Sequence, residues 1–308
     1  MTAPSLATVL VTGSSGFIGS HIAAHLHGEG WHVVGLCRNR GDFGQIRQHR
    51  LELPNPGLAA LIADLRPQII VHCAGPASVP ASVASPADDF EGTVPVMFQL
   101  LDNVRRYSPQ SGVLYISSAA VYGNARSLPI AETDEIRPIS PYGFHRSLCE
   151  QLLQQFRTLH SIRSASLRVF SAYGAGLRRQ VIWDLCMRSL NEERLHLHGT
   201  GLESRDFVHA SDIAQAIGLL AATPVWEAIY NLGAGEETAI VDLANAITSL
   251  LPAPIPVTFE GSSAAGMPDR VCADMSRLRR LGFVPRRRLL DELPGLLELA
   301  RRTLEAPV

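Results

Sequence analysis

Three glycines near the N-terminus have the spacing of a dinucleotide-binding turn. They lie in the segment TGSSGFIG at 12–19, after a short apolar run and before an amphipathic stretch. At this spacing Gly13 permits a tight turn, Gly16 lets the backbone approach a pyrophosphate, and Gly19 lets a helix pack closely on a strand. An ordinary strand–helix turn is the alternative. We predict a dinucleotide site with phosphate-binding helix amides, and its predicted contacts are Gly13, Ser15, Gly16, Phe17, Ile18 and Gly19.

A basic segment follows the second apolar run, where dinucleotide folds usually carry a carboxylate for the ribose 2′-hydroxyl of NAD. The residues there are Leu36-Cys37-Arg38-Asn39-Arg40. Because a guanidinium pairs with a phosphate, this segment favours NADP over NAD. Alternatively, Arg38 and Arg40 are solvated loop charges, or Arg38 stacks on adenine. The remaining predicted cofactor contacts are Arg38, Glu52, Leu53, Ala74 and Gly75.

All 27 basic residues of the chain are arginines, and lysine is absent. This absence excludes mechanisms that need a Schiff-base lysine or the lysine of a P-loop.

The overall composition indicates a globular protein with a small-molecule partner. The chain has 308 residues, 46% of them hydrophobic, and a formal net charge of -2, which gives no general attraction to nucleic acid or to an anionic membrane. The five cysteines form no CxxC pair, and His21 and His25, although four residues apart, lack a companion ligand, so we expect no metal site. No apolar run approaches 18 residues. We therefore expect a reduced, cytoplasmic protein that binds neither nucleic acid nor a membrane.

The elements that would position these residues alternate between strand-length apolar runs and helix-length amphipathic stretches. This rhythm is typical of an α/β fold with a doubly wound parallel (Rossmann) sheet. We predict a dinucleotide-binding domain at 1–170 and a smaller, C-terminal substrate-binding lobe at 171–308, with part of 205–235 returning to the first domain. The predicted strands are 8–11, 33–36, 69–72, 113–117 and 166–169, and the predicted helices are 18–28, 57–65, 88–107 and 142–160.

Several further motifs occur in a fixed order along nearly the whole chain. Together with TGSSGFIG they resemble the extended short-chain dehydrogenase/reductase family, which contains nucleotide-sugar epimerases, dehydratases and ketoreductases. The motifs are HCAG at 72–75, SVASP at 82–86, EGT at 91–93, SSAAVYG at 117–123, SPYGFHR at 140–146, LRVFSAYGAG at 167–176, RDFVHASDIAQA at 205–216 and YNLGAGEE at 230–237.

The resemblance implies a catalytic group of three residues. In the family a residue at the Ser118 position hydrogen-bonds the sugar oxygen, and the tyrosine at the Tyr142 position exchanges its proton, which is acid/base assistance to hydride transfer. The family's lysine, four residues after the tyrosine, is Arg146 here. A nearby cation lowers the pKa of an acid by about 1–3 units, so arginine can still favour a phenolate, but its fork-shaped head changes the geometry. Alternatively, Arg146 is an ordinary helix residue and activity is weak or lost.

The residues after Ser118 bear on the reaction type. Relatives that eliminate water carry an acidic residue there, whereas this chain has Ala119 and Ala120, so the resemblance disfavours a 4,6-dehydratase. It implies an NAD(P)-dependent epimerase that transfers a hydride at C4 of a nucleoside-diphosphate hexose. The alternatives are an NADPH-dependent reductase of 4-keto-6-deoxyhexoses and a non-catalytic NADP-binding sensor or scaffold.

The same resemblance implies how a nucleoside-diphosphate sugar is bound. Arg205 of the RDF motif and Arg270 would contact the diphosphate, for which a guanidinium fork is suited, and Ser171 stands where the family commonly has asparagine. A surface charge is an equal reading of Arg270. The family's usual homodimer pairs the helices corresponding to 88–107 and 142–160, so we expect a homodimer.

Overall fold

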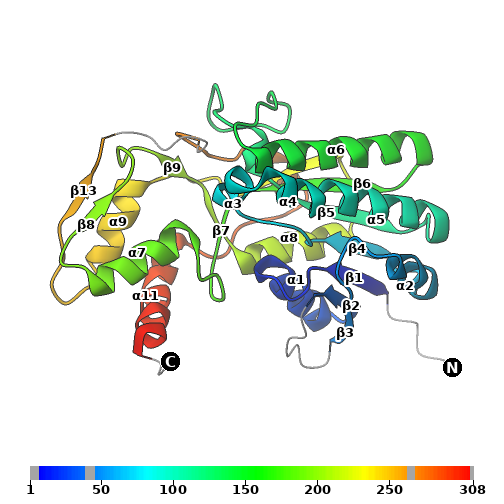
Figure 1. Cartoon of the computed structure of the whole chain (residues 1–308), viewed down its shortest axis with the longest axis horizontal. Helices are drawn as coiled ribbons and strands as arrows, with labels where there is room; N and C mark the ends of the chain where they lie inside the picture. The colour runs from blue at the N-terminus through cyan, green and yellow to red at the C-terminus, as the bar shows by residue number, and fades with distance from the viewer. Residues whose placement is uncertain (1–6, 39–45, 262–267, 306–308) are drawn as a thin grey trace.

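A seven-stranded parallel sheet organises the computed structural model, which describes residues 7–38, 46–261 and 268–305 (Figure 1). The strand order is β11-β6-β5-β4-β1-β2-β3, and every neighbouring pair is parallel. The central strands are almost wholly buried, as expected for a sheet covered on both faces. The strands are β1 (Thr8–Thr12), β2 (His32–Cys37), β3 (Arg47–Arg50), β4 (Ile69–His72), β5 (Gly112–Ser118), β6 (Ser164–Val169) and β11 (Ile229–Leu232).

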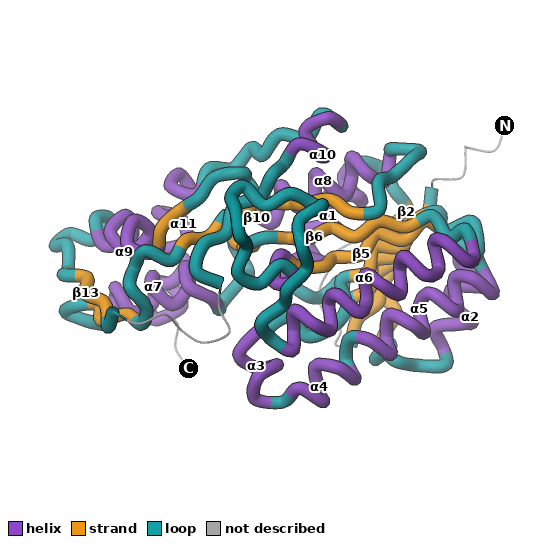
Figure 2. The backbone as a smooth tube through the Cα atoms, turned by 90° about the horizontal axis from the view of Figure 1, so that it is seen from above, coloured by secondary structure: helices purple, strands orange, loops and turns teal. Residues whose placement is uncertain are grey.

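Helices cover both faces of this sheet (Figure 2). On one face α1 (Phe17–Gly28) packs against α8 (Ala210–Ala222), and their apolar side chains share a core with β1. On the other face α5 (Val94–Tyr107) lies between α2 (Gly57–Leu65) and α6 (Pro141–His160) over a second core. The connections between these elements contain short helices, namely α3 (Val79–Ala84), α4 (Pro86–Glu91), η1 (Ala119–Val121) and α10 (Ser276–Arg280).

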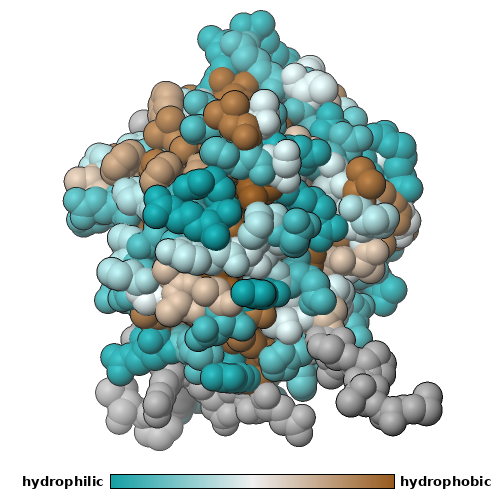
Figure 3. Space-filling model, turned by 90° about the vertical axis from the view of Figure 1, so that its right-hand side faces the viewer, coloured by the Kyte–Doolittle hydropathy of each residue, from teal (hydrophilic) through white to brown (hydrophobic). Residues whose placement is uncertain are grey.

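A smaller unit with its own apolar core lies beyond the carboxyl ends of the strands (Figure 1). Its three helices are α7 (Gln180–Asn191), α9 (Ile240–Thr248) and α11 (Leu289–Glu305). Three two-stranded pairings accompany them: β7 (Ser171–Tyr173) with β10 (Phe207–His209), β9 (Ser204–Arg205) with β12 (Thr238–Ala239), and β8 (Leu195–Leu197) with β13 (Val257–Phe259). Figure 3 shows the opposite end of the molecule, where apolar and polar side chains are interspersed.

The predicted doubly wound fold is confirmed, with three local differences. The predicted helix 88–107 is interrupted at Gly92 and Thr93, so that α4 and α5 are separate and Pro95 lies in the first turn of α5, where its missing N–H costs no hydrogen bond. The strand β3 was not predicted, because its sequence RQHR has no apolar residue and lies at the sheet edge. The other edge strand, β11, was not predicted as a strand either, although its segment was expected to return to the first domain.

The chain reverses direction across the sheet between β1 and β4. It passes from β1 outward to β3, and then returns to β4 and continues the other way. The carboxyl ends of β1 and β4 therefore flank a crevice, the usual ligand site of such sheets. A hydrogen bond of 2.7 Å between Thr12 Oγ1 and His72 Nδ1 joins the two strand ends.

Candidate active site

The glycine loop opens at the end of β1 and leads into α1. Gly13 has a φ of +69°, and a Cβ there would lie 2.8 Å from the Ala74 nitrogen. A Cβ on Gly19 would lie 2.2 Å from the Gly13 carbonyl oxygen. Gly16 caps α1 without a side chain, so the first amides of the helix can bind an anion. A side chain at Gly13 or Gly19 would therefore clash with backbone atoms, and the turn they form leaves room for a bound pyrophosphate at the start of α1.

An open cavity of about 470 Å³ lies at the carboxyl ends of β2 and β3. Arg38 and Glu52, two of the predicted cofactor contacts, line it, and Arg38 Nη1 lies 3.7 Å from Glu52 Oε1. Glu52 follows β3, the strand that the sequence did not reveal. A carboxylate therefore stands beside Arg38 after all, contributed by the neighbouring strand, whereas Arg40 lies outside the described residues.

The other predicted cofactor contacts are Leu53, which follows β3, and Ala74 and Gly75, which follow β4. Leu53 is partly buried and packs against the core beneath α2 and α5. The Ala74 N–H donates to Thr12 Oγ1 at 3.3 Å, and Gly75 has a φ of +134°, with Arg146 Nη2 3.8 Å from the place of a Cβ. The segment 73–75 thus extends from the glycine loop to Arg146.

Ser118 and Tyr142 are carried by elements that touch. Ser118 ends β5, and its Oγ accepts a hydrogen bond of 3.1 Å from the Ala120 N–H. Tyr142 lies in the first turn of α6, where its N–H donates to Ser82 Oγ at 3.1 Å. A Cβ on Gly143 would lie only 2.5 Å from the Ala120 carbonyl oxygen, so α6 packs directly on the turn that follows Ser118.

Arg146 lies one helical turn after Tyr142 and is 5% exposed. Its Cζ is 4.9 Å from the centroid of the Tyr142 ring. Nη1 donates to the Tyr115 hydroxyl at 2.9 Å, and Nη2 donates to the carbonyl of Pro76. Burial alone would lower the pKa of Arg146, but Tyr115 and Tyr142 raise it above its usual value. The guanidinium therefore stays charged beside the phenol ring.

This charge has no ionic partner in the part of the chain that the structure describes. The hydrogen-bond partners of Arg146 are a hydroxyl and backbone carbonyls. Burial, together with the charge of Arg146, lowers the pKa of His72 to about 3, so that histidine is neutral. Nε of Arg146 is buried and has no hydrogen-bond partner within the described ranges. A spare donor at this place fits a ligand that carries hydroxyl groups, such as a cofactor ribose.

The structure brings two of the predicted substrate contacts together. The guanidinium of the exposed Arg270 forms two hydrogen bonds with Glu237, of 2.7 and 2.8 Å, and Glu237 also accepts one from Ser204 Oγ. Arg205, the residue after Ser204, donates to the Ser204 carbonyl at 2.7 Å, and burial lowers its pKa. Ser171 lies at the start of β7, where its N–H donates to the carbonyl of Asp206, the residue after Arg205.

A buried carboxylate fastens the segments around these arginines. Asp206 accepts hydrogen bonds from the N–H groups of Ala234, Gly235 and Ala273, at 2.6–3.0 Å. Burial raises the pKa of Asp206 to about 6, although the three N–H donors act against that rise. Asp206 thus holds the end of β11 against the segment that follows Arg270.

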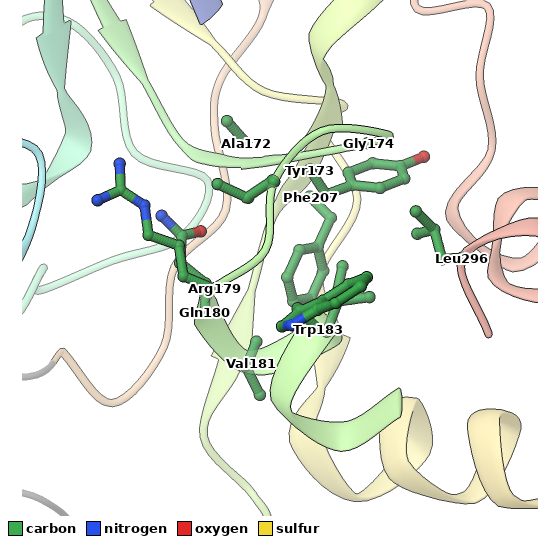
Figure 4. A pocket seen from close by; sticks show the side chains of 11 residues that line it. Ala172, Tyr173, Gly174, Arg179, Gln180, Val181, Trp183, Phe207 and Leu296 are labelled. Atoms are coloured by element: carbon green, nitrogen blue, oxygen red, sulfur yellow. The ribbon is translucent and has the colours of Figure 1, made fainter. Parts of the chain in front are cut away.

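A small apolar pocket lies between β7 and α7. Its volume is about 20 Å³, which is room for about one water molecule, and Figure 4 shows Tyr173, Trp183, Phe207 and Leu296 around it. Among the described residues, no group of three or more His, Cys, Asp or Glu side chains could hold a metal ion, and no helix is long and apolar enough to cross a membrane.

Residues around Arg146 were not predicted from the sequence. Tyr115, the Pro76 carbonyl and Ser82 all contact the pair formed by Tyr142 and Arg146. For Tyr115 a signal existed, because alternate residues of a strand share a face. Tyr115 and Ser117 alternate along β5, and Ser117 Oγ donates to Glu150 on α6 at 2.6 Å, so both residues face the helix that carries Tyr142.

Comparison with known proteins shows the family to which this chain belongs. Residues 9–233 match the model of the NAD dependent epimerase/dehydratase family, and the chain belongs to that family.

Individual relatives are named as nucleotide-sugar 4-epimerases. A UDP-glucose 4-epimerase of Azospirillum brasilense is 29% identical, with 97% of this chain and 93% of the relative covered. A putative UDP-glucose 4-epimerase of Methanocaldococcus jannaschii is also 29% identical, with 90% and 93% covered. Among solved structures, the UDP-N-acetylglucosamine 4-epimerase of Methanobrevibacter ruminantium M1, in complex with UDP-N-acetylmuramic acid, superposes with a TM-score of 0.87 at 26% identity, covering 97% and 99% of the two chains.

The preference for NADP predicted from Arg38 is wrong. The UDP-glucose 4-epimerase of Thermus thermophilus, with a TM-score of 0.86 at 26% identity and 96% and 99% of the chains covered, is a complex with NAD. The enzyme of Brucella ovis, with a TM-score of 0.84 at 28% identity and 94% and 96% covered, is also a complex with NAD. The structure supplies a physical reason, because the Glu52 carboxylate beside Arg38 would repel a 2′-phosphate and can accept a hydrogen bond from a ribose hydroxyl. The relatives likewise do not support the reductase alternative.

Proposed function

We propose that this protein is an NAD-dependent epimerase that inverts C4 of the hexose in a UDP-sugar. The observation that carries the proposal is the buried guanidinium of Arg146, which lies 4.9 Å from the Tyr142 ring and has no carboxylate partner in the described chain. A cation without a counter-charge stabilises the negative charge that forms when a phenol loses its proton. The relatives and solved structures named as UDP-sugar 4-epimerases support the same reaction.

Residues of this chain would hold the cofactor along the carboxyl ends of the strands. The first amides of α1 would bind the pyrophosphate, Glu52 the adenosine ribose, and the free Nε of Arg146 the second ribose. When bound, NAD supplies the acceptor and donor of the hydride that leaves C4 and returns to it on the opposite face.

The protein's own residues manage the proton on the sugar oxygen. Tyr142 Oη takes the proton from the C4 hydroxyl as that carbon becomes a ketone, and later gives it back. Ser118 Oγ hydrogen-bonds the same oxygen and keeps it aligned. Arg146 stabilises the phenolate form of Tyr142, which accepts the proton in the first transfer and forms again when the proton is returned. Ala119 and Ala120 offer no carboxylate to remove a C5 proton, which disfavours elimination of water.

The diphosphate of the substrate would lie at the cluster around Glu237. Arg205 and Arg270 present guanidinium groups there, and such groups bind phosphate oxygens with two parallel hydrogen bonds. Binding would transfer Arg270 from the Glu237 carboxylate to the phosphate. Ser171 would hydrogen-bond the sugar.

The assembly and cellular setting belong to the same proposal. Apolar side chains on the outer faces of α5 and α6, among them Phe98, Phe144 and Leu148, are exposed in the single chain, which supports a homodimer that buries these faces. All five cysteines are free, which supports a reducing, cytoplasmic location.

Turnover by Arg146 variants tests this function. The purified protein, supplied with NAD and with UDP-glucose, UDP-N-acetylglucosamine or UDP-glucuronate, should form the 4-epimer of at least one of them, as measured by chromatography. Tyr142→Phe should lower kcat by about 100-fold or more, because the proton carrier is lost. Arg146→Lys should keep measurable turnover and Arg146→Ala should lose about tenfold or more, because only the former keeps the charge.

Two results would contradict the proposal. Full activity of Arg146→Ala would remove Arg146 from catalysis. Binding of NAD without turnover, and without a thermal shift on adding any UDP-sugar, would support the non-catalytic alternative.

A further inference from the structure

The partners of Arg146 show what an arginine needs at this position. A guanidinium is a planar fork with fixed donor directions, whereas an ammonium is a compact charge that can turn its three donors. In the structure Nη2 is held by the Pro76 carbonyl and Nη1 by the Tyr115 hydroxyl. A second acceptor of Nη1, the Ile116 carbonyl oxygen, lies 3.5 Å away, at the limit of a hydrogen bond. The Tyr115 hydroxyl is therefore the main restraint on one arm of the fork.

Tyr115 is itself held rigidly. Its side chain is 1% exposed, and its ring stacks on His72 with 5.8 Å between the ring centroids and 26° between the planes. Two residues along β5, Ser117 is hydrogen-bonded to Glu150 on α6. The strand that carries Tyr115 and the helix that carries Arg146 are thus joined at a second point, so the hydroxyl cannot easily follow a moving guanidinium.

The Tyr115 hydroxyl also stays neutral beside this cation. Burial raises the pKa of Tyr115 well above its usual value, more than Arg146 lowers it. Burial also raises the pKa of the neighbouring Cys149 thiol to about 11, although a hydrogen bond with Tyr115 acts in the opposite direction. The hydroxyl therefore accepts from the guanidinium without taking over its charge, and that charge remains available to Tyr142.

We propose that Tyr115 is a positioning residue, whose hydroxyl fixes the Arg146 guanidinium against the ring of Tyr142. The inference rests on the proposed function, in which Arg146 stabilises the phenolate of Tyr142. The requirement is specific to arginine, because an ammonium at position 146 can turn toward the carbonyls of Pro76 and Ile116 instead. Tyr115 and Arg146 thus form a functional pair in this chain.

A double-mutant cycle tests the pair. Tyr115→Phe keeps the ring stacked on His72 and removes only the hydroxyl. In the wild-type background it should lower kcat for 4-epimerisation by about tenfold, because a hydrogen bond to a charged group is lost, leave KM for the UDP-sugar unchanged, and move the acid limb of the pH profile of kcat upward. In an Arg146→Lys background the same change should cost less than about twofold. Equal losses in both backgrounds, or no loss in the wild type, would overturn the proposal.

Arginine side-chain NMR provides a second readout that needs neither substrate nor cofactor. The guanidinium resonance that disappears in Arg146→Lys identifies Arg146, and in the wild-type protein it should exchange slowly with solvent. Tyr115→Phe should speed that exchange by about tenfold or more. Unchanged exchange would exclude the positioning role even if activity fell. This measurement also separates the positioning role of Tyr115 from the proposed epimerase function, because it reports on the contact between Tyr115 and Arg146 even if the wild-type protein epimerises no substrate.

Tyr230→Phe is the matched control. It also removes a buried tyrosine hydroxyl, which accepts a hydrogen bond from the Glu227 N–H at 2.8 Å in the region of β11. Its melting temperature should fall, while kcat and the exchange of the Arg146 resonance stay at wild-type values. An equal fall of kcat in this control would show that the effect of Tyr115→Phe is general destabilisation, and would contradict the proposal.

Discussion

Arg146 connects the composition of the chain to its chemistry. The absence of lysine reaches the one position where the resembled family uses lysine beside its catalytic tyrosine. The sequence showed that charge is preserved there and that geometry changes, but it could not show how the fork is accommodated. The answer depends on a hydroxyl and a backbone carbonyl, from Tyr115 and Pro76, that come from other strands and loops. Backbone acceptors of this kind leave no signal in residue types.

The buried His72 gives a prediction at the same scale. Its pKa is about 3 in the folded protein, lowered by burial and by Arg146, against 6.5 for a free histidine. The unfolded chain therefore takes up the proton first, so the contribution of His72 to stability is complete above pH 6.5 and is lost as the pH falls toward 3. Between pH 6.5 and 4 the wild-type free energy of unfolding should fall by about 3 kcal/mol more than that of His72→Gln. Denaturant titrations at several pH values measure the difference, and parallel curves for the two proteins would contradict it.

At the scale of elements, apolar periodicity was a good guide and polar segments were not. The strands β1, β2, β4, β5 and β6 were predicted to within two residues, because apolar side chains that the sheet buries recur in each of them. The edge strand β3 was missed because it has no apolar side chain, and the position of Glu52 beside Arg38 was missed with it. The wrong preference for NADP follows from that omission, since the end of β2 alone carries arginine without a carboxylate.

The exposed faces of α5 and α6 give the prediction at this scale. Phe98 on α5 is 50% exposed and packs edge-on against Phe156 of α6, while Phe144 and Leu148 lie one turn apart on α6. If two copies bury these faces, sedimentation should give the mass of a dimer for the wild type. Phe98→Glu or Leu148→Glu should give a monomer, because a buried charge without a partner is costly.

Leu290→Glu, on the exposed side of α11, is the control and should remain dimeric. A wild-type monomer, or dissociation of the control as well, would contradict this interface.

At the scale of the whole molecule, the doubly wound sheet places the separate signals along one edge. The glycine loop after β1, the segment after β4 and Ser118 at the end of β5 all lie at the carboxyl ends of parallel strands. The order of motifs in the sequence was enough to predict this arrangement, because parallel strands bring their carboxyl ends to one side. The position of the arginine cluster was harder to predict, since Arg205 and Arg270 are joined through Ser204 and Glu237 of the smaller unit.

The fate of the hydrogen on C4 tests the central claim most directly. A UDP-hexose with deuterium at C4 is incubated with the protein and NAD, without any added reductant, and the products are analysed by NMR and mass spectrometry. Hydride transfer at C4 with return to the opposite face predicts the 4-epimer with deuterium still on C4. An absence of the 4-epimer for every UDP-hexose tried, or a 4-epimer that has exchanged its C4 deuterium for a solvent proton, would contradict the account.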